Sequence, residues 1–249
     1  STTNVYELTG HDESTLSGDF SEVFQKRFMN VGSLSLLTVD AIPEDCQAIF
    51  ITAPQSDLSE DDLSKLSQYL GNGGKIYLSI DYSKKLLSDN SIETTESLLA
   101  ETDRSYYYQS PFYLLPNVEN TEVSSSVAGM TQVFVPYSVG LTYTGEDDSN
   151  VTSFMTTSDT TIAKAAANIA AVQSQADAAN IASVQDGDTQ GQYSLGMMVT
   201  NENGGELCVL GSAMMCTDSA NQIVSGHNAT LFNGIVNALV TTDDENSDN

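Results

Sequence analysis

The order of strand-like and helix-like segments in the first 82 residues restricts the fold more than any other feature of this sequence. Four short runs rich in apolar or β-forming residues cover 5–9, 34–40, 48–54 and 75–81. Amphipathic segments separate the first run from the second, and the third from the fourth. A helix that returns along one face of a sheet joins parallel strands. The order therefore predicts an α/β fold in which helices cover a mainly parallel sheet.

The two intervening segments have the spacing and the end signals of helices. Residues 19–28 carry apolar side chains at helical spacing on one face: Phe20, Val23, Phe24 and Phe28. In the second segment, Ser59 precedes Asp62 by three residues, as in a capping box. A leucine stripe follows: Leu63, Leu66 and Leu70. The glycine-rich run 71–74 ends this helix, because glycine tolerates left-handed backbone.

Patterns in the middle of the chain are weaker. The run "SIETTESLLAETD" at 91–103 predicts a helix with Leu98 and Leu99 buried. Residues 132–138 and 151–158 predict strands. Residues 162–186 are rich in alanine and poor in large apolar side chains, which predicts either an exposed helix or a mobile insertion.

The last third predicts a hairpin and a final helix. Strand-like runs at 193–200 and 206–213 flank the turn sequence "NENGG". The run 229–240 places three apolar side chains at a spacing of four: Leu231, Ile235 and Leu239. We divide the chain into a first half, 1–110, a second half that packs on or extends the same sheet, 111–240, and an acidic tail, 241–249.

The charge of the chain excludes several classes of partner. Eight Lys and Arg residues stand against 34 Asp and Glu residues, which gives a net charge of −26. Such a surface repels phosphate backbones and anionic lipid headgroups, so nucleic acid is excluded as a partner. No uninterrupted apolar run reaches the length of a membrane span, and we expect no signal peptide before Ser1. The abrupt start fits an excised fragment as well as a complete cytosolic protein.

Nucleotide-binding motifs are incomplete. The run "GNGGK" ends in Gly-Lys, but Tyr69 stands where a P-loop needs glycine and Ile76 where it needs a hydroxyl residue. The loop after the first strand has Gly10 and Gly18 without the G-x-G-x-x-G spacing of dinucleotide-binding proteins. We therefore predict no cofactor.

Metal and nucleophile motifs are similarly weak. The run "DGDTQG" at 186–191 opens like a calcium loop, but Met197 replaces the bidentate glutamate, so a turn is the better interpretation. Two histidines exclude a multi-histidine metal site. No nucleophile elbow is present. Among the three cysteines, Cys46, Cys208 and Cys216, only Cys216 falls in a loop region that His227 could share.

Two stretches resemble a known family. "VYELTGHDES" and "IPEDCQAIFITAPQSDLSEDDLSKLSQYLGNGGKIYLSID" resemble the GldG-like auxiliary components of gliding-motility-type ABC transport systems. That family has a T-G-H-G-E-like turn, a "P-x-D-x-x-x-L-x-I-x-x-P" strand and an acidic-start helix ending in G-G. "SFMTTSD", "GELCVLGSAMMCTD" and "NATLFNGIVNAL" are similar to its later segments. Asp12 stands where the family often has glycine, and "GSAMM" lacks the acidic residue of its "G-D-S-D-F" loop.

The resemblance implies a fold, a location and partners. The fold would be a Rossmann-like or amidotransferase-like three-layer α/β sandwich, with an antiparallel hairpin near the C-terminus. The domain would lie on the extracytoplasmic side of the cell membrane, tethered by flanking transmembrane helices. Its partners would be an ABC permease and an ATPase subunit, and it would have no catalytic activity of its own.

The default ligand site of an open α/β sheet is the crevice at the carboxyl ends of its strands. This rule nominates eight residues that follow three predicted strands: Thr9, Gly10, His11, Asp12, Pro54, Gln55, Asp81 and Tyr82. The alternative is that these residues form ordinary turns at the strand ends and have no functional role. Two other functions stay open: a hydrolase or amidotransferase-like enzyme using the same crevice, and a sugar- or peptide-binding module, favoured by the tyrosines at 106–108.

Overall fold

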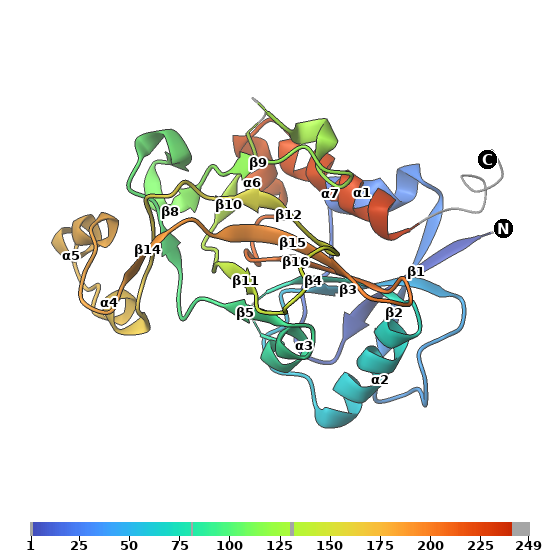
Figure 1. The fold of residues 1–249 in the computed structure, drawn as a ribbon. Helices are drawn as coiled ribbons and strands as arrows, with labels where there is room; N and C mark the ends of the chain where they lie inside the picture. Colours follow the sequence, from blue (N-terminus) through green and yellow to red (C-terminus); the bar gives the residue numbers. More distant parts are fainter. Residues whose placement is uncertain (1, 81, 130–131, 241–249) are drawn as a thin grey trace.

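A ten-stranded sheet lies between two layers of helices (Figure 1). The computed structural model describes residues 2–80, 82–129 and 132–240. Five neighbouring strands run parallel, in the spatial order β2 (Met29–Ser35), β1 (Thr3–Thr9), β3 (Cys46–Thr52), β4 (Lys75–Ser79) and β16 (Glu206–Leu210). The predicted α/β class is therefore confirmed.

The sheet continues beyond β16 with antiparallel strands. They are β15 (Ser194–Thr200), β11 (Leu141–Tyr143) and β5 (Ile92–Thr94), with β12 (Val151–Thr156) and β9 (Asn117–Val118) on a branch from β15. Strands β15 and β16 form the predicted hairpin, in which Met198 lies opposite Cys208. β5 stands at the end of the main strand order, so one of its edges is unpaired within the described residues.

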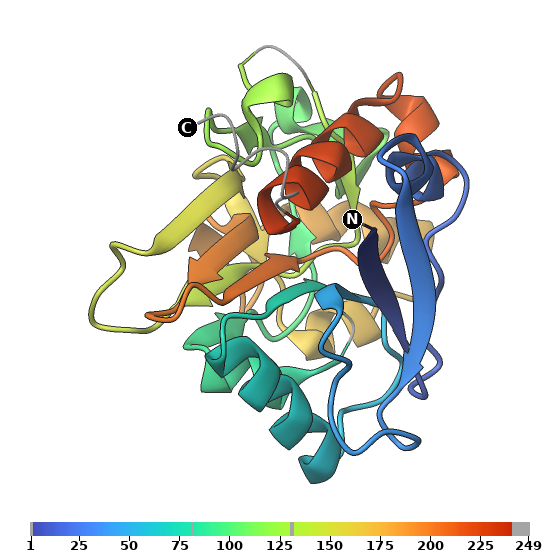
Figure 2. The same cartoon turned by 90° about the vertical axis from the view of Figure 1, so that its right-hand side faces the viewer.

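The helices cover the two faces of the sheet, as Figure 2 shows. One face carries α1 (Asp19–Lys26), α6 (Asp218–Ile223) and α7 (His227–Leu239), and the other carries α2 (Glu60–Gly71) and α3 (Lys84–Asp89). Successive residues of β3 point to opposite faces. Phe50 packs with the α1 and α7 side chains, whereas Ile49 and Ile51 pack with α2. The apolar run in β3 therefore reflects burial on both faces.

Phe232 of α7 is the centre of an aromatic cluster under the first helix layer. Its ring lies 5.5–6.2 Å from four others, measured between ring centroids: Phe20, Phe24, Phe50 and Tyr77. The interplanar angles of these pairs are edge-to-face, which aromatic quadrupoles favour. Leu231, Ile235 and Leu239 of the same helix are buried, as predicted.

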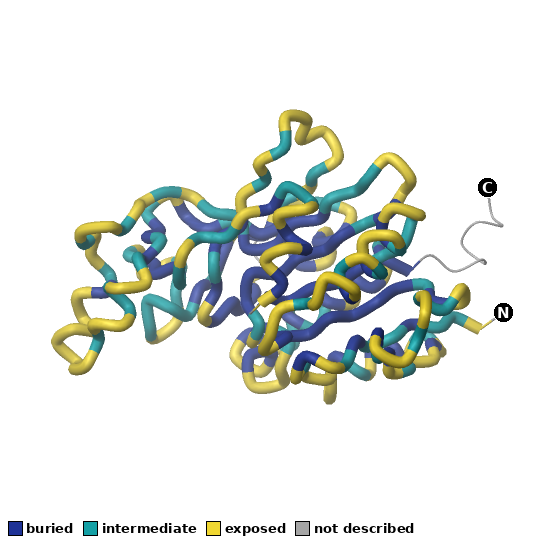
Figure 3. Tube along the Cα trace, turned by 90° about the horizontal axis from the view of Figure 1, so that it is seen from below, coloured by how far each residue is buried: buried dark blue, intermediate teal, exposed yellow. Residues whose placement is uncertain are grey.

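Two smaller sheets extend the molecule. One contains β7 (Tyr107–Tyr108), β8 (Ser110–Leu114) and β10 (Val135–Pro136), and the 3-10 turn η1 (Arg104–Tyr106) leads into it; a second 3-10 turn, η2 (Ser125–Val127), packs against α7. The other contains β6 (Leu99–Ala100), β13 (Thr161–Ala163) and β14 (Thr189–Gly191). This second sheet and the chain between β13 and β14 form what we name the distal lobe; Figure 3 shows much of its surface exposed.

The alanine-rich run in the distal lobe forms short helices in place of one long helix. They are α4 (Ala166–Ala170), α5 (Gln175–Ala179) and the 3-10 turn η3 (Asn180–Ala182). A buried ion pair between Lys164 and Asp188 closes the segment. The Lys164 ammonium also donates to Ser183 O at 3.2 Å and to Gln185 Oε1 at 3.1 Å. Asp188 belongs to "DGDTQG", so a side-chain cation of the chain itself neutralises one of the carboxylates that resembled a calcium ligand.

Three predictions about elements are wrong. Residues 91–103 form no helix; they contribute the short strands β5 and β6. Helix α1 ends at Lys26, and Phe28 adopts a positive φ of 55° with 89 % of its surface exposed, so it lies outside the apolar face. The second strand covers Met29–Ser35 and ends early in the predicted run. In each case tertiary pairing overrides local propensity. The acidic tail predicted at 241–249 lies outside the described residues.

Candidate functional site

The carboxyl ends of the parallel strands carry strained backbone. Three non-glycine residues that follow parallel strands have positive φ between 50° and 87°: Asp12, Ala53 and Ser83. Such conformations cost energy in L-residues and gather at functional sites. Ala53 is held in place because its amide donates to Ser79 O at 3.2 Å and to Ser79 Oγ at 3.0 Å. This edge of the sheet, which we name the carboxyl edge, is therefore the first place to look for a site.

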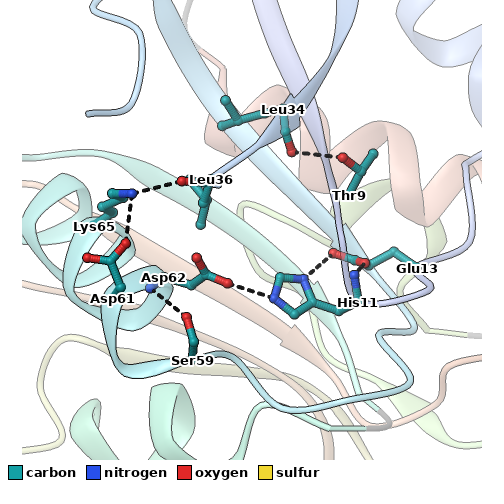
Figure 4. Close-up of polar contacts among 9 residues, drawn as sticks. All are labelled: Thr9, His11, Glu13, Leu34, Leu36, Ser59, Asp61, Asp62 and Lys65. Carbon is teal, nitrogen blue, oxygen red and sulfur yellow. Dashed lines mark hydrogen bonds and ion pairs between the residues drawn. The ribbon is translucent and has the colours of Figure 1, made fainter. Parts of the chain in front are cut away.

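His11 is clamped between two carboxylates, as Figure 4 shows. Its Nδ1 lies 3.0 Å from Glu13 Oε2 and its Nε2 lies 2.9 Å from Asp62 Oδ2. Glu13 reaches back to His11 because its second carboxylate oxygen accepts the His11 backbone amide. Asp62 comes from the first turn of α2, where its own amide donates to the N-cap Ser59 Oγ at 3.1 Å. We name these three residues, His11, Glu13 and Asp62, the histidine clamp.

Burial and the neighbouring carboxylates shift the pKa of His11 in opposite directions. Only 7 % of the His11 surface is exposed, and this burial disfavours the imidazolium form and by itself lowers the pKa. The hydrogen bonds and charges of Glu13 and Asp62 outweigh burial and raise the His11 pKa above its ordinary value. Asp62 Oδ1 is buried without a hydrogen-bond partner among the described residues. The clamp thus joins the β1 loop to α2 through a favoured positive charge.

The structure brings the nominated residues of β1 and β3 together. Thr9 Oγ1 donates to Leu34 O at 3.2 Å, and Gly10 has a φ of 108° that glycine adopts without strain. The Gln55 amide donates to His11 O at 2.8 Å, which holds the two loops side by side. Pro54 is buried and Asp12 is exposed. Asp81, the seventh nominated residue in chain order, lies outside the described residues.

An open groove of about 940 Å³ begins beside these loops. We name it the carboxyl-edge groove. Its lining comes from the loop after β3, the turn between β4 and α3, α3 itself, β5 with the two residues after it, and one residue before β11: Gln55, Asp57, Ile80, Tyr82, Lys84, Lys85, Leu87, Ser88, Ile92, Glu93, Thr94, Thr95, Glu96 and Val139. Of the nominated residues, Gln55 and Tyr82 reach the groove, and Tyr82 is 42 % exposed. The histidine clamp is not part of the lining.

Sequence reasoning missed most of the residues that shape this edge. The position of Glu13, two residues after His11, was the one sequence feature that could have indicated its contact with the imidazole. Asp62 was assigned only to the helix start, and nothing local connects it with a histidine 51 positions away. Asp57 was also missed. Its Oδ1 accepts the amides of Ser83 and Lys84 at 2.9 and 3.3 Å, and so fixes the turn between β4 and α3.

The turn between β4 and α3 has the strand–turn–helix order of a nucleophile elbow. Ser83 occupies its left-handed position, but only 1 % of this residue is exposed and Asp57 binds its amide. Both ring nitrogens of His11 are engaged by carboxylates, and His227 Nδ1 donates to Gln132 O at 2.7 Å. Within the described residues, the buried Ser83 hydroxyl forms no hydrogen bond, to a histidine or to any other group. A hydroxyl without a base is a poor nucleophile.

The cysteines are also poor nucleophiles. Burial raises the pKa of Cys46 to about 11 and that of Cys216 to about 12, and it raises the pKa of Cys208 well above the ordinary value. The Cys216 thiol accepts a hydrogen bond from Tyr77 Oη at 3.4 Å. The pairing of Cys216 with His227 that the sequence left open therefore has no activated thiol. Within the described residues, no cluster of three metal-binding side chains occurs.

Comparisons with known proteins identify solved structures with a similar fold, but no match in sequence. No protein-family model matches the chain, and no curated protein matches it in sequence. The mmIFT52 N-terminal domain is similar in structure, with a TM-score of 0.67 at 15 % identity over 96 % of this chain and 98 % of that one. A glutamine amidotransferase from Thermotoga maritima has a TM-score of 0.58 at 8 % identity over 97 % and 100 % of the two chains. These likenesses show the amidotransferase-like α/β fold alone.

Proposed function

We propose that this chain is a non-catalytic, extracytoplasmic domain of a membrane-tethered accessory protein in an ABC transport system. It would bind a partner protein or ligand at the carboxyl edge, while the permease and ATPase subunits would move the substrate and handle ATP. The transport role comes from the GldG-like sequence features at 5–14 and 42–81. The fold is shared by the mmIFT52 N-terminal domain and by a glutamine amidotransferase, so it does not choose between binding and catalysis.

The histidine clamp is the observation that supports a binding role most directly. A general base must reach the nucleophile with a free ring nitrogen. Both ring nitrogens of His11, the histidine at the carboxyl edge, already contact carboxylates within 3.0 Å. The thiols have raised pKa values and Ser83 is buried. The same edge offers an open groove with an exposed tyrosine, which suits recognition better than acid–base chemistry.

The transport role is tested on the full gene product. We expect its sequence to contain apolar spans of membrane-crossing length on either side of this domain, and its neighbouring genes to encode an ATPase and a permease. The full-length protein, extracted in detergent, should then co-purify with both. Copurification that survives deletion of the domain would show that the flanking helices make the contact. The absence of spans and of both neighbours would overturn the transport role.

The alternative enzyme reading is tested by activity. The purified domain is incubated with glutamine and with ester and amide model substrates, and products are followed with Cys216→Ser and Ser83→Ala variants alongside. We expect no turnover above buffer. Turnover that either variant abolishes would establish a hydrolase or amidotransferase-like enzyme in place of the binding domain.

A further inference from the structure

The carboxyl-edge groove runs along an unpaired strand edge. Its lining includes five consecutive residues, 92–96, which form β5 and the chain just after it. On the side toward β11, β5 pairs antiparallel with Leu141–Tyr143. No strand pairs with its other side in the described part of the chain. Figure 1 places α3 next to this strand, and side chains of α3 form another wall of the groove.

The hydrogen-bond register shows which backbone groups face the unpaired side. Thr95 N donates to Gly140 O at 2.9 Å and Thr144 N donates to Ser91 O at 2.8 Å. In an antiparallel ladder, alternate residues direct both backbone groups to the partner strand, and the residues between them direct both groups away. Thr95 directs its backbone groups to the partner strand, so the amide and carbonyl of its neighbour Thr94 face away from β11. Thr94 is also partly exposed and lines the groove.

The side chains around this edge suit an extended peptide. The floor is apolar, from Ile80, Leu87 and Val139. The α3 wall carries Lys84 and Lys85, two of only eight cationic side chains in the chain, and the opposite wall carries Glu93 and Glu96. Walls of opposite charge complement a ligand that has both signs, and a peptide has such groups along with backbone donors and acceptors. The volume, about 940 Å³, lies near the upper end of the range for small-molecule sites.

We propose that the carboxyl-edge groove binds an extended peptide segment of a partner protein as an added strand on β5, through the backbone of Thr94 and the exposed ring of Tyr82. Strand addition of this kind takes its affinity from main-chain hydrogen bonds and its specificity from neighbouring side-chain pockets. The proposal rests on the proposed function in one respect: it treats this edge as a binding site.

The probe is a phage-displayed library of random peptides, selected on the purified domain at high salt. High salt screens the attraction of basic peptides to a chain of charge −26. The selected peptide is synthesised and its affinity measured by calorimetry. Thr94→Pro removes one outward amide without removing a bond to β11, and edge strands tolerate proline. We expect Thr94→Pro and Tyr82→Ala to bind about tenfold more weakly or worse.

Thr94→Ala is the matched control, because it keeps the backbone amide and should keep the wild-type affinity. Thermal unfolding checks that each variant is folded. If Thr94→Pro does not fold, the affinity of Tyr82→Ala for the peptide tests the proposal. Hydrogen exchange should show the Thr94 amide protected by the peptide. Recovery of no peptide, wild-type affinity in both variants, or protection confined to another surface would overturn the proposal. Catalytic turnover would defeat the proposed function without changing the binding result.

Discussion

His11 Nε2 lies 2.9 Å from Asp62 Oδ2, although 51 positions separate the two residues in the chain. The contact ties the loop after β1 to the first turn of α2. Asp62 is favourably placed there in two ways, because the N-terminus of a helix attracts negative charge and Ser59 caps its amide. The strand-to-helix turn at His11 is therefore stabilised from both ends, and this stability has a predictable dependence on pH.

We expect His11→Gln to lower the free energy of unfolding by about 3–5 kcal/mol in mildly acidic solution, since it leaves Glu13 and Asp62 buried without a cation. The His11 pKa is raised in the folded state. Its contribution is therefore complete below the unfolded-state value of about 6.5 and is lost as the pH rises through the higher folded-state value. Urea unfolding of both proteins across this pH range measures the difference, which should shrink with rising pH.

His227→Gln is the control for this pH series, since His227 is the one other histidine of the chain and donates to a backbone carbonyl. It should lower the free energy of unfolding less than His11→Gln does, because glutamine can also donate a hydrogen bond to that carbonyl. A difference between wild type and His11→Gln that stays constant with pH would show that His11 stabilises the turn without carrying a charge.

Lys164→Met should open the distal lobe while the main sheet stays folded. The Lys164 and Asp188 side chains are fully buried, and removing the cation leaves a buried carboxylate unpaired at a cost of about 3–5 kcal/mol. Hydrogen exchange of residues 161–191 should accelerate accordingly. Lys85→Met removes an exposed pair with Asp89 and should change stability far less, because exposed ion pairs contribute little. Equal effects of the two substitutions would contradict the argument.

Phe232→Ala should lower the free energy of unfolding by about 3–5 kcal/mol, because it leaves a cavity among four aromatic rings. Phe28→Ala provides the comparison, since Phe28 is 89 % exposed, and it should change stability by no more than about 0.5 kcal/mol. Both values come from urea unfolding. Comparable losses in the two variants would mean that Phe28 packs in solution.

The three thiols should react slowly with an aromatic disulfide reagent in the native protein and rapidly in denaturant. Burial raises the pKa of Cys46 to about 11 and of Cys216 to about 12, so the reactive thiolate is scarce at pH 8. Absorbance of the released thiol gives the rates. One thiol that reacts in the folded protein as fast as in denaturant would identify an activated cysteine and favour the enzyme reading.

Local pattern was enough to place most of the parallel core. Spacing in 19–28 predicted the buried face of α1 except for Phe28, Ser59 predicted the start of α2, and the apolar run 48–54 predicted β3. These features depend on residues within a few positions of each other, and the 3.6 and 2.0 periods report them directly. The same reasoning failed at 91–103, where helical spacing was present but the chain pairs as strands.

The sequence by itself determined the fold class and which residues follow the parallel strands at the carboxyl edge, because strand and helix signals are local and their order fixes the edge. The tertiary structure alone decided what stands at that edge. It joined His11 with Asp62, closed the alanine-rich segment with Lys164 and Asp188, and left the outer side of β5 open beside Tyr82. These relationships join residues far apart in the chain, and they depend on how whole elements pack.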